Sequence, residues 1–166
     1  LDDDGFVASQ DKAVADVIRM QENAGLGVVT DGEFRRRSWF AGFVDGVEGL
    51  IHQNTKFNFI EGNEASVSVP VPHAQARIRR TDGITTDEFS YARDVSKLPV
   101  KITMPAPSVI HFFRGPDGMD RKVYPEDDMY WKDLTSVYME EIQALGNLGL
   151  TSLQLDEVPM ALFCDE

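Results

Sequence analysis

Apolar residues recur every three to four positions in several stretches of the chain. This is the spacing of a helix that buries one face. The longest stripe consists of Tyr130, Leu134, Val137, Tyr138, Ile142 and Leu145. Asp11, Thr86 and Ser108 are the expected N-caps of three of these helices, because their side-chain oxygens can accept hydrogen bonds from the first backbone amides. We therefore predict helices over residues 11–25, 38–50, 87–96, 109–113 and 126–146.

Short apolar runs occupy residues 27–30, 99–104 and 151–155, and predicted helices separate them. Strands that alternate with helices pair in parallel through right-handed crossovers. Residues 56–80 differ, because polar and apolar residues alternate there around Gly62-Asn63. Such alternation is typical of antiparallel strands. The sequence thus predicts an α/β fold with an antiparallel β-hairpin inserted at 56–80.

Length and charge narrow the class of protein. The chain has 166 residues, so we predict a single domain over residues 1–166. Acidic residues outnumber basic ones by 28 to 16, which gives a net charge of −12. Such a surface repels nucleic acid and anionic membranes, and neither is an expected partner. The chain has no apolar run of about 18 residues that could span a bilayer. One cysteine, Cys164, favours a reducing, cytoplasmic location.

Polar residues follow all three predicted parallel strands. Asp31-Gly32-Glu33 follows the first, a proline turn with Ser108 follows the second, and Asp156-Glu157 follows the third. Ligands in parallel α/β folds bind beyond the carboxyl ends of the strands. A substrate site at this edge is one interpretation. The alternatives are solvated turn acids, a structural ion pair with one of Arg35–Arg37, and an N-cap role for Ser108.

Other chemistry finds little support in the residues. The three histidines lie far apart, and none stands at a metal-ligand spacing from Cys164. The cysteine has no adjacent basic residue that would favour a thiolate. A phosphate-binding glycine loop and a Ser-His-Asp signature are both absent from the sequence.

Three stretches together resemble the catalytic domain of cobalamin-independent methionine synthase. They are AVADVIRMQENAGLGVVTDGEFRR, VKITMPAPS and LGLTSLQLDEVP, and they follow that superfamily's motifs in order over about residues 11–160. The match is closest to the shorter, single-barrel homologues. The resemblance implies a (β/α)8 TIM-type barrel. It also implies a methyltransferase of methionine biosynthesis that moves a methyl group from methyltetrahydrofolate to homocysteine, whose thiol a zinc ion holds as thiolate.

The resemblance also implies roles for individual residues. The family's substrate-binding acid falls on Glu33, and a second acid that contacts the substrate amino group falls on Asp156. Phe113 lies about where the family stacks an aromatic ring on the pterin, and the proline turn lies on the folate side. Five further residues are candidates for the substrate pocket, namely Asp31 in the turn that presents Glu33, Ser108, Glu157, and Trp39 and Arg35 at the rim.

The sequence departs from the family at its ends. The family's zinc ligands, a His-x-Cys pair, a Glu and a further Cys, follow the third motif, whereas this chain ends at Glu166. We therefore predict no metal ligand in this chain. Three parallel strands cannot close an eight-stranded barrel. We expect a partial barrel that is inactive alone and whose open sheet edges favour oligomers. The alternatives are a related zinc-thiolate alkyl transferase with another donor and a non-catalytic remnant.

Overall fold

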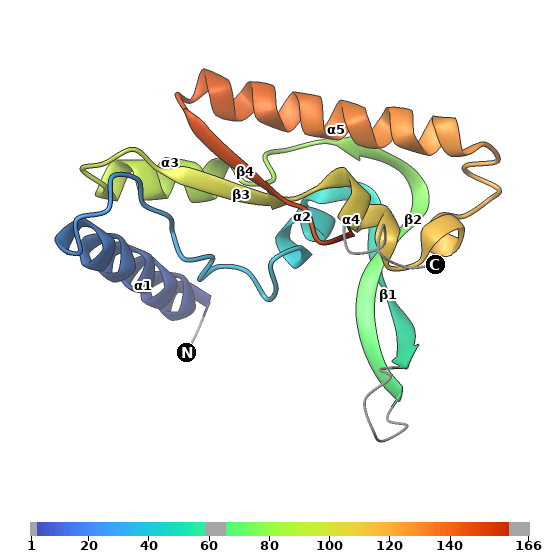
Figure 1. Cartoon of the computed structure of the whole chain (residues 1–166), viewed down its shortest axis with the longest axis horizontal. Coiled ribbons are helices and arrows are strands. Elements are labelled where there is room, and N and C mark those ends of the chain that lie inside the picture. Colours follow the sequence, from blue (N-terminus) through green and yellow to red (C-terminus); the bar gives the residue numbers. More distant parts are fainter. Residues whose placement is uncertain (1–2, 59–65, 160–166) are drawn as a thin grey trace.

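The computed structural model describes residues 3–58 and 66–159. The protein has an α/β fold in which helices and strands alternate along most of the chain (Figure 1). Its two sheets are small. β3 (Lys101–Pro105) and β4 (Ser152–Asp156) form a parallel pair, and β1 (Val47–Asn58) and β2 (Ser66–Arg80) form an antiparallel pair. None of the helices in these described ranges is long and apolar enough to cross a bilayer.

The parallel region follows the predicted order, but its first member is shorter than expected. Only Val29 pairs with β3, through an isolated parallel bridge to Val100. At Thr30, both backbone groups are hydrogen-bonded to the side-chain amide of Gln21. The amide donates to the Thr30 carbonyl at 2.8 Å and accepts from the Thr30 N–H at 3.0 Å. The predicted strand 27–30 is therefore wrong in extent, because a helix side chain replaces a neighbouring strand at Thr30.

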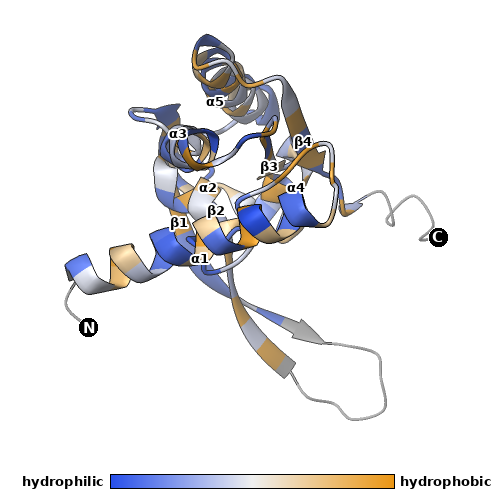
Figure 2. Ribbon diagram, turned by 90° about the vertical axis from the view of Figure 1, so that its left-hand side faces the viewer, coloured by the Kyte–Doolittle hydropathy of each residue, from blue (hydrophilic) through white to orange (hydrophobic). Residues whose placement is uncertain are grey.

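The hairpin begins earlier in the chain than the predicted 56–80. β1 starts at Val47, and the helix expected over 38–50 is reduced to α2 (Ala41–Gly46). Gly49 has a φ of 88°, and a Cβ there would lie 2.6 Å from the carbonyl oxygen of Arg77. This glycine allows the irregularity between Glu48 and Leu50 that bends β1 against β2. The outer part of the hairpin projects away from the rest of the molecule (Figures 1 and 2).

Neither Asp11 nor Thr86 is the N-cap that was expected. α1 (Asp3–Asn23) extends well before Asp11, so Asp11 lies inside the helix and is not its N-cap. The N-cap of α3 (Thr86–Val95) is Thr85. The remaining helices are α4 (Pro107–Phe112), the 3-10 helix η1 (Gly115–Gly118) and α5 (Asp127–Asn147).

The core has two clusters of buried side chains. One packs the base of the hairpin and α2 against α5, with Phe43, Leu50, Ile78 and Leu134 among its members. The other packs α1 and α3 against β3. The buried stripe of α5 differs from the predicted one at one position: Glu141 is fully buried and Ile142 is 43% exposed. A carboxylate therefore stands where the apolar pattern predicted isoleucine.

Candidate functional site

Three segments that carry the predicted site residues end at one edge of the parallel region. Val29, β3 and β4 run in the same direction, so residues 31–33, 105–108 and 156–157 lie at or just after their carboxyl ends. The backbone N–H of Ala106 donates to the carbonyl of Asp156 at 2.9 Å. The Ser108 hydroxyl donates to the Glu157 carboxylate. The geometry thus joins the second and third of these strand ends directly.

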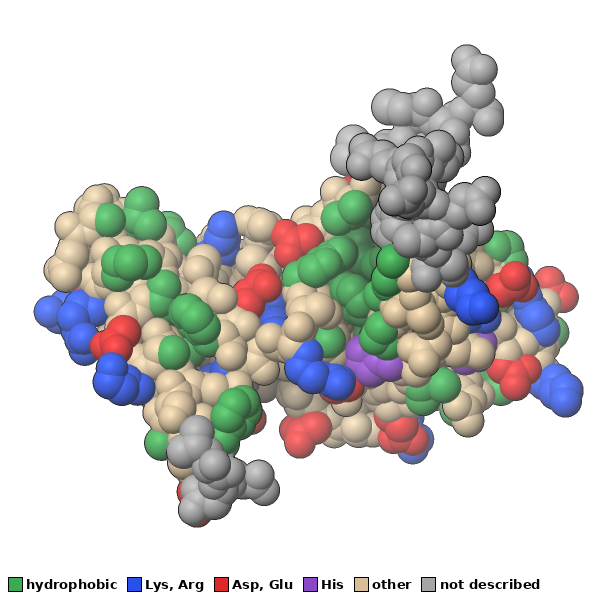
Figure 3. Space-filling model, turned by 90° about the horizontal axis from the view of Figure 1, so that it is seen from below, with side chains coloured by type: hydrophobic (Ala, Val, Ile, Leu, Met, Phe, Trp, Pro, Cys, Tyr) green, Lys and Arg blue, Asp and Glu red, His purple; other side chains and the backbone are tan. Residues whose placement is uncertain are grey.

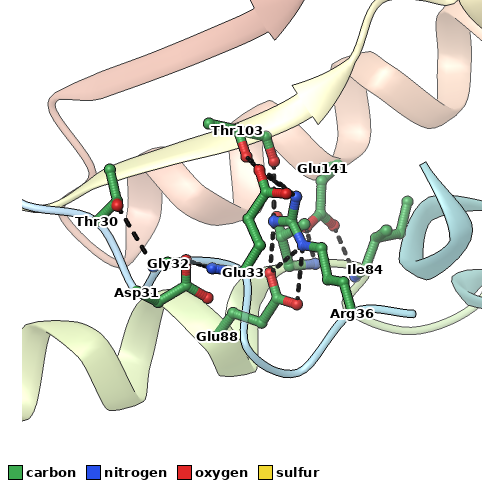
Figure 4. A network of polar contacts seen from close by, with 10 residues as sticks. Thr30, Asp31, Gly32, Glu33, Arg36, Ile84, Glu88, Thr103 and Glu141 are labelled. Carbon is green, nitrogen blue, oxygen red and sulfur yellow. Dashed lines mark hydrogen bonds and ion pairs between the residues drawn. The ribbon is translucent and has the colours of Figure 1, made fainter. Parts of the chain in front are cut away.

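A tight turn presents Glu33. The Asp31 carboxylate accepts a hydrogen bond from the Glu33 N–H at 3.0 Å, and the Thr30 hydroxyl accepts one from the Gly32 N–H at 3.3 Å. Gly32 and Glu33 both have positive φ values, 70° and 57°. The left-handed region is uncommon for a non-glycine residue, and such conformations cluster at functional sites. The turn directs the Glu33 side chain toward β3 (Figure 4).

The Glu33 carboxylate meets Thr103 and Arg36. One of its oxygens, Oε1, accepts a hydrogen bond from the Thr103 hydroxyl and lies 3.4 Å from Nη1 of Arg36. Arg36 Nη1 also donates to the Thr103 hydroxyl oxygen at 3.0 Å. The Glu33 side chain keeps 31% of its surface exposed. It is therefore oriented by the protein and still reachable from solvent.

Arg36 is fixed more firmly still. Its guanidinium donates to Glu88 of α3 through Nε at 3.1 Å and through Nη2 at 2.6 Å, and Nη2 also donates to the Thr103 carbonyl at 2.9 Å (Figure 4). Burial by itself would lower the pKa of Arg36, but the ion pair with Glu88 raises it. Burial raises the pKa of Glu88, and the charges of Asp31 and Glu33 raise it further against the opposing effect of Arg36. The cluster thus holds three acids around one cation.

Asp31 is the most deeply buried of these acids. It is 3% exposed, and its Oδ2 atom has no hydrogen-bond partner among the residues that the structure describes. Its other oxygen holds the turn through Glu33. Asp31 therefore lies under the turn, where it adds negative charge close to Arg36.

The end of β4 is more open. Asp156 accepts a hydrogen bond from the Gln154 side chain at 2.6 Å, and Glu157 is exposed. The expected N-cap role of Ser108 is wrong, because Ala106 occupies that position and α4 starts at Pro107. Ser108 is then in the first turn of α4, and its hydroxyl is available to Glu157.

The two aromatic candidates lie on a different part of the molecule's interior. Phe113 and Trp39 are partly buried, and both rings contact Phe40, with centroids 5.1 Å and 5.4 Å away. Phe40 also lines a pocket of about 170 Å³ together with Arg37 and His52. Hydrophobic side chains gather near the middle of the face in Figure 3, with acidic side chains beside them. Through their ring contacts, Trp39 and Phe113 pack around Phe40.

Two of the arginines that follow Glu33 pair with acids outside the predicted set. Arg35 pairs with Asp11 of α1 and lies 4.7 Å from the ring centre of Tyr91. Arg37 pairs with Asp45 at 2.9 Å. The expectation that one of them pairs with Asp156 or Glu157 finds no contact in the described part of the chain, because each has a nearer partner.

Sequence reasoning missed three polar residues of the interior. Thr103 interrupts the apolar strand β3, and Glu88 precedes the buried Phe89 of α3. Glu141 accepts hydrogen bonds from the N–H of Ile84 at 3.1 Å and of Thr85 at 2.7 Å, and it pairs with Arg80 at 2.8 Å. Thr103 and Glu141 could have been found from the sequence, because each is a polar residue within a run or stripe of apolar residues.

A zinc site does not fit the residues that the structure describes. Within 3–58 and 66–159, no three side chains of His, Cys, Asp or Glu are grouped so that they could hold a metal ion. Cys164 lies outside these ranges.

The sequence matches the family described as cobalamin-independent synthase, catalytic domain, over residues 2–163. The chain belongs to this family. Two relatives from Bacillus subtilis (strain 168) are the "Uncharacterized protein YxjH", 24% identical over 162 residues, and the "Uncharacterized protein YxjG", 28% identical over 156 residues. The matches cover 95% and 90% of this chain but only 41% and 39% of those proteins.

Two solved structures share the fold. One is a B12-independent methionine synthase from Shewanella sp. W3-18-1 in complex with selenomethionine, with a TM-score of 0.76 and 21% identity. The other is a putative vitamin-B12 independent methionine synthase from Listeria monocytogenes, with a TM-score of 0.72 and 23% identity. The likeness covers 100% and 95% of this chain and 46% and 43% of those chains. This domain therefore has the fold of somewhat less than half of such a protein.

Proposed function

We propose that this domain serves a methyltransferase that moves a methyl group from 5-methyltetrahydrofolate to the thiol of homocysteine, forming methionine. Family membership supports the reaction class. The chain spans about two fifths of its curated relatives, so the reaction is proposed for the protein encoded by the complete reading frame. Within it, the present strands and helices would form part of a (β/α)8 barrel, and zinc would be held by residues other than those described here.

The contribution proposed for this chain is recognition of the substrate amino group. The observation that carries it is Glu33, a solvent-reachable carboxylate held in a left-handed backbone conformation at the edge where the parallel strands end. A carboxylate pairs well with an ammonium group. Asp156 is the last residue of the neighbouring strand β4, at the same edge, and is the second acid proposed for the amino group.

A related protein supports an amino acid ligand. The Shewanella enzyme was solved with selenomethionine, which carries an ammonium group and a carboxylate. Phe113 and the proline turn at 105–107 are proposed for the folate side, with Ser108, Glu157 and Trp39 around the pocket. The cytoplasmic location and the association of open sheet edges stay predictions from the sequence.

Titration of the chain with L-methionine tests the recognition step. Glu33→Gln and Asp156→Asn are each expected to weaken binding by about 2–5 kcal/mol, because each leaves the ammonium without its charged partner. Glu48→Gln is the matched control, since Glu48 pairs with Arg79 on the hairpin. Binding that is unchanged in both site variants would contradict the proposal.

The reaction itself is tested with the protein of the complete reading frame. Methionine formation from homocysteine and 5-methyltetrahydrofolate is the expected result. Thiol alkylation from another donor, without turnover of the methylfolate, would instead favour the related alkyl transferase. Absence of turnover with every donor would favour a binding remnant.

A further inference from the structure

The hydroxyl of Thr103 has only one possible hydrogen-bond arrangement. Arg36 Nη1 donates to the Thr103 oxygen at 3.0 Å, and a guanidinium can only donate. The single hydroxyl hydrogen must therefore point elsewhere, and the Glu33 carboxylate stands in hydrogen-bond contact with it. An ionised carboxylate can only accept. The order from donor to acceptor is thus Arg36, Thr103, Glu33.

Arg36, the first donor of this chain of hydrogen bonds, is held by several contacts. Arg36 is 4% exposed, and Glu88 from α3 and the Thr103 carbonyl from β3 occupy its other donors. Rotation of the guanidinium would break several buried hydrogen bonds at once. The Thr103 hydroxyl is held in turn, since its backbone belongs to β3 and its oxygen accepts from Arg36.

The cluster carries more negative than positive charge. Arg36 and Glu88 form a close ion pair and cancel each other's charge. Glu33 also lies 3.4 Å from Arg36, and the buried Asp31 adds a third carboxylate, so three acids share one cation and the cluster is negative in excess. An ammonium group would reduce this excess, whereas a carboxylate or phosphate would increase it. The arrangement therefore selects for the amino end of an amino acid.

We propose that Thr103 is a positioning residue that fixes one oxygen of Glu33 and thereby directs the rest of that carboxylate at the substrate ammonium. The inference rests on the proposed function, since it assigns Glu33 to the same group. It adds Thr103 of β3 to the site. It also gives a reason for specificity, because a carboxylate fixed in one orientation binds a positive charge best at one position. A purely structural clamp between β3 and the turn would not distinguish ligands by their amino group.

The experiment compares two ligands and three variants of the chain. The ligands are L-methionine and 4-(methylthio)butanoate, which lacks only the amino group, and binding is followed by calorimetric or NMR titration. Thr103→Val keeps the shape and removes the hydroxyl, Thr103→Ser keeps the hydroxyl, and Glu33→Gln removes the charge. We expect Thr103→Val to weaken methionine binding roughly 5- to 30-fold and to leave the analogue unchanged. Thr103→Ser should stay within about threefold of the wild type.

The outcomes separate this proposal from the one on which it rests. If Glu33→Gln weakens methionine binding and Thr103→Val does not, Thr103 has no positioning role. If Thr103→Val weakens both ligands equally, its effect is structural and the proposal is wrong. If neither Glu33→Gln nor the loss of the amino group affects binding, the assignment of Glu33 fails, and the role of Thr103 fails with it. In the Glu33→Gln background, Thr103→Val should have no further effect on methionine binding, because the two residues act as one unit.

Discussion

Acidic side chains of this protein occupy two contrasting regions. In the interior, Glu88 accepts hydrogen bonds from Arg36, and Glu141 accepts them from Arg80 and from the backbone N–H of Thr85. At the end of β4, Asp156 and Glu157 are more exposed, and their side chains contact the uncharged Gln154 and Ser108. Asp156 and Glu157 were recognisable in the sequence as acids after an apolar run, whereas Glu88 and Glu141 were not predicted to be buried.

The difference follows from how each strand is covered. β3 lies between Val29 and β4, and buried side chains of α3 pack against it. Acids near β3 therefore need partners when they lose water. β4 pairs with β3 on one side in the described structure, and its Leu155 is 43% exposed. The interior acids are consequently preorganised, whereas those after β4 remain in contact with solvent.

Removal of the buried cation should have the largest effect on this contrast. Arg36→Met leaves Glu88 and Glu33 without their guanidinium, and we expect a loss of about 3–5 kcal/mol in the free energy of unfolding. Arg37→Met is the matched control, because Arg37 is 73% exposed and pairs with Asp45 at the surface; its effect should be under about 1 kcal/mol. Urea denaturation followed by circular dichroism measures both. Similar losses in the two variants would show that Arg36 is not part of a buried network.

Truncation of Glu141 tests the second interior acid. Glu141→Ala removes the acceptor for Arg80, for the Ile84 and Thr85 amides and for the Thr85 hydroxyl, and should cost about 2–4 kcal/mol. Glu140→Ala provides the comparison, since Glu140 is exposed and bonds only Ser136 among the contacts described. The same denaturation experiment applies. A Glu140 variant as unstable as the Glu141 variant would contradict the interior role.

Proton linkage should separate Glu88 from surface acids. Because burial raises the pKa of Glu88 above that of an ordinary glutamate, the folded state binds its proton more tightly than the unfolded state. Stability contributed by this group is lost as the pH rises above the ordinary pKa. As the pH rises, the unfolding free energy of the wild type should therefore decline relative to that of Glu88→Gln. A relative increase with pH would mean that the ion pair with Arg36 dominates the titration.

The smallest effect is expected at the end of β4. Ser108→Ala removes the hydrogen bond to the exposed Glu157, and the unfolding free energy should change by less than about 0.5 kcal/mol. Thermal denaturation provides the measurement. A loss comparable to that of Arg36→Met would show that the strand end is as firmly organised as the interior.

Particular elements show where sequence patterns succeeded. The alternation of strands and helices predicted the α/β class, and the motifs around Glu33, Thr103 and Asp156 predicted the family to which the chain belongs. Boundaries were less accurate. A helix was predicted over 38–50 despite three glycines in this segment, whereas β1 already starts at Val47. The apolar stripe of α5 was correct except at one position, where Glu141 replaces Ile142 in the core.

The sequence by itself determined the α/β class and the order of most elements, and it placed acidic residues after apolar runs, because periodicity is a property of neighbouring residues. Only the tertiary structure decided which of these acids are buried and with which cation each is paired. Arg36 meets Glu88 across 52 positions of sequence, and Arg80 meets Glu141 across 61. Such contacts depend on how β3, α3 and α5 pack, and no local pattern specifies that packing.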